Sequence, residues 1–193
     1  MNILEADSER LLTAVRSLLE RKGIVSTAEV MERMAITDAA SPGQGARMVA
    51  KAWVDPAYRA RMLEDGTKAA EELGIVMRGM PPLGVLESTA EVHNLVVCTL
   101  CSCYPRAVLG YPPFWYKSAS FRARAIRDPR ELLASEWKTV VPDDVKVRVV
   151  DSTADYRWMV LPVRPAGTDG WDEDRLAGIV REGDMIGVTV PAV

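Results

Sequence analysis

The sequence predicts an α+β fold, with a helical N-terminal arm over residues 1–80 followed by an α/β sandwich domain over residues 81–193. Two observations predict it. Before residue 80 the apolar side chains recur at helical spacing, as Leu11, Val15 and Leu18 illustrate. After residue 80, short valine-rich or alternating segments typical of strands are mixed with short helical segments. Helices followed by a mixture of strands and helices are typical of a sheet covered on at least one face.

Capping residues and glycines divide the arm into short helices. Gly23 ends the first helix, and Ser26 with Glu29 three residues later forms a capping box that begins the second. Two later helices are expected to begin where a capping residue precedes a proline, at Ser41–Pro42 and at Asp55–Pro56. The last helix of the arm is expected to end at Gly74.

The segment "VMRGMPPLGVLEST" changes character, because its glycines and prolines break a helix, and it predicts a hinge between the arm and the rest. Beyond it, strands are expected over residues 91–98, 145–151, 156–163 and 183–190. Helices are expected over residues 118–127, from Asp128 onward, and after Asp172, which is a plausible N-cap.

Composition excludes several classes of protein. The formal net charge of -3 lacks the basic excess of a nucleic-acid-binding protein. No run of 18 apolar residues spans a membrane, and the start "MNILEADSERLL" lacks the features of a signal peptide. We therefore expect a cytoplasmic protein that binds neither nucleic acid nor membrane.

All three cysteines, Cys98, Cys101 and Cys103, lie in the segment "CTLCSC". Free cysteines are often small buried apolar residues, but such crowding is unusual for that role. A thioredoxin-like pair would leave Cys103 without a function, and a c-type haem needs a histidine where Ser102 stands. A structural zinc site needs four ligands, and the only histidine, His93, is five residues upstream of Cys98.

A single tight loop around one metal ion uses all three thiols. The peptide nitrogens of Ser102 and Cys103 lie between the sulfurs, and when deprotonated they would bring the donors to five and leave one position open. Because these five donors carry many negative charges, they favour a trivalent metal ion, iron(III) or cobalt(III). An open coordination position on such a Lewis acid indicates catalysis. A metal-carrying or redox-sensing module without catalytic activity stays open as an alternative.

The segment "VCTLCSC" resembles the metal-binding signature of nitrile hydratase α subunits, cobalt type. The resemblance extends over "ARMVAKAWVDPAYRARMLEDGTKAAEELG", "LGYPPFWYKSASFRAR" and "RWMVLPVRPAGTDGWDEDRLAGIV". It implies a helical arm joined to an α/β domain that carries the metal loop, and the hydration of a nitrile to an amide. It also implies one cobalt(III) ion per chain, because Thr99 between the first two cysteines is typical of the family members that bind cobalt.

The resemblance assigns roles to the loop residues. Cys98 would be the axial thiolate, Cys101 a sulfinate, and Cys103 a sulfenate whose oxygen is the nucleophile or base. The amides of Ser102 and Cys103 would be the nitrogen ligands. His93 and Glu87 match the family's approach to the loop and would orient it from a second layer.

The same resemblance implies partners. The family assembles with one or more β subunits, which supply arginines to the oxidised sulfurs, and a metallochaperone or activator loads the metal; the substrate is a small nitrile. Many relatives have tryptophan where this chain has Arg106, so we expect a more polar pocket. That feature resembles the cobalt subunit of thiocyanate hydrolase, and the short chain resembles a three-subunit relative that acts on the nucleoside nitrile toyocamycin.

Overall fold

The computed structural model describes residues 3–193, with side-chain environments from residue 7 onward. The chain forms two compact units that divide between Ala39 and Ala40. The predicted boundary between arm and domain at residue 80 stays a prediction, and the unit that begins at Ala40 contains three helices of the predicted arm as well as the strands.

The first unit consists of α1 (Ile3–Arg21) and α2 (Thr27–Ala39). The predicted capping box is confirmed, because Ser26 donates its N–H to the Glu29 carboxylate at 2.7 Å and its Oγ accepts from the Glu29 N–H at 3.2 Å. Along α1, Leu11 and Leu12 are 66% and 70% exposed, so this helix has apolar side chains that the first unit does not cover. No helix within residues 3–193 has the length and apolar character needed to cross a membrane.

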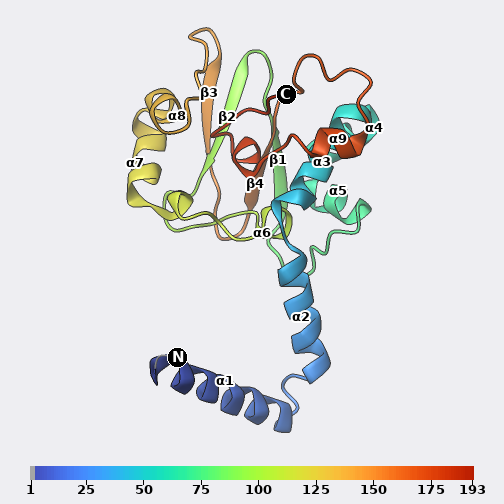
Figure 1. The fold of residues 1–193 in the computed structure, drawn as a ribbon, viewed down its shortest axis with the longest axis vertical. Helices are drawn as coiled ribbons and strands as arrows, with labels where there is room; N and C mark the ends of the chain where they lie inside the picture. Colours follow the sequence, from blue (N-terminus) through green and yellow to red (C-terminus); the bar gives the residue numbers. More distant parts are fainter. Residues whose placement is uncertain (1–2) are drawn as a thin grey trace. The chain divides into compact units, whose positions relative to one another are not determined.

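The second unit opens with α3 (Pro42–Val54), α4 (Pro56–Glu64) and α5 (Gly66–Glu72). Asp55 caps α4 as predicted, since its side chain accepts from the N–H groups of Ala57 and Tyr58. Met48 and Val49 of α3 are fully buried in the core of this unit. Figure 1 shows α3, α4 and α5 on one side of the strands. Helices α4 and α5 pack against the first strand, β1 (Leu83–Glu87).

Within residues 3–193, four strands form two parallel pairs. β1 (Leu83–Glu87) pairs with β4 (Arg157–Leu161), and β2 (Val92–Val97) pairs with β3 (Lys146–Asp151). The remaining elements are short: α6 (Arg106–Leu109), η1 (Trp115–Lys117), α7 (Ala119–Arg127), α8 (Pro129–Trp137), α9 (Glu173–Ala177) and η2 (Glu182–Met185). Helices α7 and α8 cover the β2–β3 pair (Figure 1), which confirms an α+β fold with helices on the strands.

The predicted hinge contains a strand that the sequence did not suggest. β1 begins directly after Pro81–Pro82 and is buried along most of its length. Its Gly84 is not a turn residue: a Cβ there would overlap the ring of Trp158 on the neighbouring β4. The glycine is required by the close approach of a large aromatic ring, a reason that is not visible in the local sequence.

The strand expected over residues 183–190 does not form. Met185, Ile186 and Val188 are buried, as an apolar strand would be, but a single main-chain hydrogen bond joins residues 183–190 to β2, from the Val96 N–H to the Ile186 carbonyl at 2.8 Å. Gly187 then takes a φ of +87, and a Cβ at this position would overlap the Asn94 carbonyl. The chain turns at this glycine because β2 passes too close for any larger residue.

Candidate metal centre

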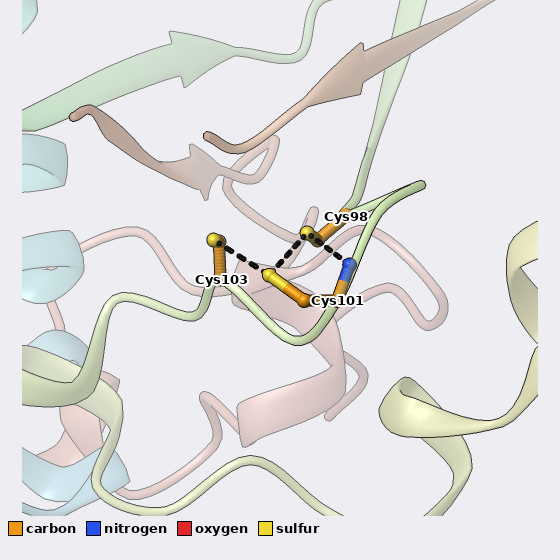
Figure 2. Close-up of side chains that lie close together, drawn as sticks. All are labelled: Cys98, Cys101 and Cys103. Atoms are coloured by element: carbon orange, nitrogen blue, oxygen red, sulfur yellow. Dashed lines mark hydrogen bonds between the residues drawn. The ribbon is translucent and has the colours of Figure 1, made fainter. Parts of the chain in front are cut away.

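The three cysteine thiols converge on one point directly after β2. Cys98 follows the last residue of that strand, and the chain then turns so that Cys101 and Cys103 face it (Figure 2). The Cys101 sulfur lies 3.5 Å from that of Cys98 and 3.2 Å from that of Cys103, and all three sulfurs lie within 4.8 Å of one another. Cys98 and Cys103 are buried, whereas Cys101 is exposed.

The sulfurs lie close enough together for one metal ion to bind all three. For metal–sulfur bonds of about 2.3 Å, right angles separate neighbouring sulfurs by roughly 3.3 Å and tetrahedral angles by roughly 3.8 Å. The two neighbouring separations, 3.5 and 3.2 Å, are of this size. Among the described residues, the three cysteines form the group of side chains that could hold a metal ion. Their sulfurs are the soft thiolate ligands that the sequence led us to expect.

The surroundings of Cys101 and Cys103 shift the pKa values of their thiols in opposite directions. The hydrogen bond with the Cys103 thiol, followed by that with Cys98, lowers the pKa of Cys101 below the usual value for a thiol. Burial raises the pKa of Cys103 to about 12, although the positive charge of Arg157 opposes that rise. Cys101 therefore loses its proton more readily than Cys103.

Asp151 holds the start of the loop, and sequence reasoning missed it. It accepts from the Thr99 N–H at 3.0 Å and from the Thr99 hydroxyl. Asp151 ends β3 opposite Val97, the residue before Cys98. A signal was present, because β3 and β2 were both predicted as strands, and the carboxyl ends of parallel neighbours meet at one edge of a sheet.

Replacing Asp151 with alanine should weaken metal binding roughly 10-fold or more, since losing a partner that orients a metal-binding loop typically costs 10–100-fold in affinity. The measurement is competitive metal titration of the purified chain with a chelator. Asp144→Ala, an exposed carboxylate before β3, is the matched control and should bind like the parent. Equal affinity in both variants would show that Asp151 does not hold the loop.

Aromatic residues hold the far end of the loop. The Tyr116 hydroxyl, which is fully buried, donates to the Cys103 carbonyl at 2.9 Å. The Tyr104 hydroxyl donates to Glu182 at 2.5 Å, and the Tyr104 and Tyr116 rings pack edge to face with centroids 4.9 Å apart. Trp115 packs on Phe121 and Trp137 in the core, as the sequence favoured. The cysteine loop is therefore fixed at both ends by hydrogen bonds.

Two of the residues expected to support the loop contact other parts of the structure. The His93 Nε2 lies 2.7 Å from the Gly187 carbonyl, and burial lowers the pKa of its imidazole, so it is a neutral donor that fixes the C-terminal segment. Glu87 pairs with Arg59, and its carbonyl accepts from the Asn94 side chain at 2.7 Å. Thr99, in contrast, contacts Asp151 at the start of the cysteine loop.

Arg106 lies beside the loop, where a hollow of about 170 Å³ opens next to Tyr104 and Pro105. Its guanidinium lies over the ring of Tyr111, 4.2 Å from the centroid. A second arginine, Arg157, lines the same hollow, and the other lining residues are mainly apolar: Met77, Met80, Pro81, Leu83, Ala107 and Val108. We call this cavity the Arg106–Arg157 hollow, and the expectation of a more polar substrate pocket stays a prediction.

The fold and the site together define a protein with a thiolate metal loop carried at the edge of a parallel strand pair. The family model described as nitrile hydratase, alpha chain, matches residues 6–189. The cobalt-containing nitrile hydratase subunit alpha of Pseudonocardia thermophila is 44% identical over 97% of this chain and 96% of its own. The chain therefore belongs to the nitrile hydratase α-chain family.

Thiocyanate hydrolases are similar to this chain as well. The thiocyanate hydrolase subunit gamma of Thiobacillus thioparus is 43% identical over 96% of this chain and 81% of its own. A solved recombinant thiocyanate hydrolase with partially modified cobalt centres has a TM-score of 0.85, at 43% identity over 96% of this chain and 90% of that one. Sequence similarity alone therefore does not separate the two activities.

Proposed function

We propose that this chain is the metal-carrying catalytic α subunit of a cobalt nitrile hydratase, which adds water to a nitrile to give the amide. The observation that carries the proposal is the convergence of three thiols within 4.8 Å on one loop, in a chain of this family. Relatives from Pseudonocardia thermophila and Rhodococcus rhodochrous are named as cobalt-containing nitrile hydratase subunits, which supports cobalt as the metal.

The loop residues would hold the metal through the sulfurs of Cys98, Cys101 and Cys103 and the peptide nitrogens of Ser102 and Cys103. When bound, cobalt(III) supplies a Lewis acid that polarises the nitrile. Cys103 would carry an oxygen that attacks the nitrile carbon or activates water for the attack. Because Asp151 and Tyr116 fix the two ends of the loop, this oxygen is held in one place, and proximity then contributes to the rate.

Partners complete the proposal. The uncovered apolar side chains of α1 support an arm, residues 1–80, that binds a β subunit. The sulfurs of Cys101 and Cys103, once oxidised, need hydrogen-bond donors for their oxygens, and we assign part of these donors to that β subunit. An activator protein that loads cobalt, and a location in the cytoplasm, belong to the same proposal.

Incubation of the cobalt-loaded chain with nitriles, with and without its partner subunit, tests the function. Amide should form in the complex, and the chain alone should be much less active. A fully cobalt-loaded complex that forms no amide from aliphatic nitriles, aromatic nitriles or toyocamycin would contradict nitrile hydration. Equal activity of the chain alone would contradict the role of the partner.

A second candidate, the cobalt subunit of a thiocyanate hydrolase, is favoured by one observation. Arg106 and Arg157 place two positive charges at the hollow beside the cysteine loop. Thiocyanate is an anion, whereas nitriles are neutral, so a cationic hollow would bind the former more strongly. The preference for thiocyanate over a neutral nitrile is therefore the property that separates the two candidates.

Arg106→Trp should lower kcat/KM for thiocyanate by about tenfold, because a charged partner of an anion is lost. For a neutral aromatic nitrile the same variant should keep or raise kcat/KM, since the hollow becomes more apolar. Arg106→Lys retains the charge and should retain most of the activity on thiocyanate. An unchanged ratio of the two kcat/KM values in Arg106→Trp would remove Arg106 from substrate selection.

A further inference from the structure

Tyr104, which directly follows the last cysteine, is tied to a residue far away in the sequence. Its side chain is buried, and its hydroxyl donates to the Glu182 carboxylate at 2.5 Å. A hydrogen bond from a hydroxyl to a carboxylate is charge-assisted, and such bonds are stronger than those between neutral groups. The end of the cysteine loop is therefore joined firmly to η2, the short turn that Glu182 begins.

The turn that carries Glu182 is anchored on β2, the strand that leads into the cysteine loop. The Val96 N–H donates to the Ile186 carbonyl at 2.8 Å, and the His93 Nε2 lies 2.7 Å from the Gly187 carbonyl. Both contacts hold the chain just after η2 against the strand. Glu182 therefore has a fixed position relative to the start of the loop as well as to its end.

Tyr104 needs this tie because one side of its ring borders empty space. It lines the Arg106–Arg157 hollow, which measures about 170 Å³. A side chain beside a void lacks the close contacts that hold other core side chains on every side. Within residues 3–193, Glu182 is the hydrogen-bond partner of the Tyr104 hydroxyl. Without this acceptor the buried hydroxyl would be unpaired, and the ring would have room to turn toward the hollow.

A movement of Tyr104 reaches Cys103 by two routes. The two residues are adjacent in the chain, so the main chain transmits the movement directly. The Tyr104 ring also packs on the ring of Tyr116 with centroids 4.9 Å apart, and the Tyr116 hydroxyl donates to the Cys103 carbonyl at 2.9 Å. The position of Cys103 therefore depends on where the Tyr104 ring is held.

We propose that Glu182 is a positioning residue for the metal centre, and that it holds Cys103 in place through Tyr104. The inference rests on the proposed function, in which Cys103 binds the metal through its sulfur and its peptide nitrogen. Residues that orient a metal ligand from outside typically change affinity or activity 10–100-fold when they are replaced. Glu182 would exert this effect from the far end of the chain, by way of a phenol hydroxyl.

The test compares Glu182→Ala with Glu182→Gln in the assembled, cobalt-loaded enzyme. Alanine removes the acceptor, whereas glutamine keeps a carbonyl oxygen that accepts from the Tyr104 hydroxyl. The first measurement is the visible absorption band of charge transfer from thiolate to cobalt, because this band responds to the arrangement of the ligands. Its maximum should shift in Glu182→Ala and stay at the parent position in Glu182→Gln.

Steady-state kinetics with a nitrile give a second measurement. In Glu182→Ala, kcat should fall about tenfold, which is the lower end of the range for a residue that orients a ligand. KM should stay close to that of the parent, because a misplaced loop affects the transition state rather than substrate binding. Glu71→Ala, which replaces an exposed glutamate of α5, is the matched control and should resemble the parent in band, kcat and KM.

Tyr104→Phe determines whether Glu182 acts through Tyr104. Phenylalanine keeps the ring and loses the hydroxyl, so this variant should show the band shift of Glu182→Ala by itself. Adding Glu182→Ala to Tyr104→Phe should then change neither the band nor kcat further, since the two residues act through one bond.

Three results would overturn the proposal: an unshifted band in Glu182→Ala, an equal shift in Glu182→Gln and Glu182→Ala, or a full additional effect of Glu182→Ala in the Tyr104→Phe background. The absorption band requires cobalt and thiolates but no hydration of a nitrile. It therefore tests this inference separately from amide formation by the parent complex, which tests the proposed function.

Discussion

Cys98→Ala should abolish stable cobalt binding while leaving the chain folded. Cys98 is 1% exposed directly after β2, and its sulfur accepts from the Cys101 N–H at 3.2 Å, so the loop turns around this residue. Removing its sulfur deletes one of three thiolates. Since losing only an outer partner costs roughly 10–100-fold, losing this ligand should weaken binding by more than about 100-fold.

The cost to folding should be small by comparison. Deleting one buried sulfur atom removes apolar area similar to that of a methylene, about 1 kcal/mol. Thermal unfolding of the metal-free chain would show whether the variant is folded, and cobalt per chain would be measured on the same sample.

Ser102→Ala is the matched control within the loop. The proposed ligand at this position is the peptide nitrogen, which alanine retains, so this variant should hold cobalt. Full cobalt occupancy in Cys98→Ala, or loss of cobalt in Ser102→Ala with a folded chain, would contradict the ligand assignment.

The mature loop should be heavier than the encoded one by about 48 Da, because each added oxygen contributes about 16 Da along the path from thiol to sulfenic and sulfinic acid. The asymmetry follows from exposure: Cys101 is exposed and should carry two oxygens, whereas Cys98 is buried against β2 and should carry none. Cys103, which is buried, should carry the remaining one.

A thiol reductant should remove activity by acting on Cys103 first. Sulfenates are reduced by thiols, whereas sulfinates generally are not, so the excess mass should fall from about 48 to about 32 Da as activity disappears. The tryptic peptide 79–106 contains all three cysteines and reports both values. Full hydration activity in a sample whose Cys103 carries no oxygen would exclude that oxygen as the nucleophile.

Local signals in the sequence predicted those parts of the fold that depend on neighbouring residues. The Ser26–Glu29 box and the Asp55 cap are made by groups within three residues, and both form as expected. The strand before Cys98 was equally evident, because β2 is an uninterrupted buried run. The cysteine cluster itself was predictable for the same reason, since all its ligands lie within six positions.

Features that depend on distant residues were not predictable. Gly84 reads as a helix breaker, yet it serves the packing of Trp158, which is far away in the sequence. Gly187 ends an apolar run because β2 passes beside it. Asp151 looked like the polar end of a strand, and its role became visible only when β3 was paired with β2 and its carboxylate reached Thr99.

Quantifying metal in the purified, assembled complex tests the central claim most directly. The account predicts about one cobalt per chain, with little zinc or iron, since a single loop supplies the whole ligand set. A complex that forms amide with zinc as its stoichiometric metal, or with no metal at all, would contradict the account.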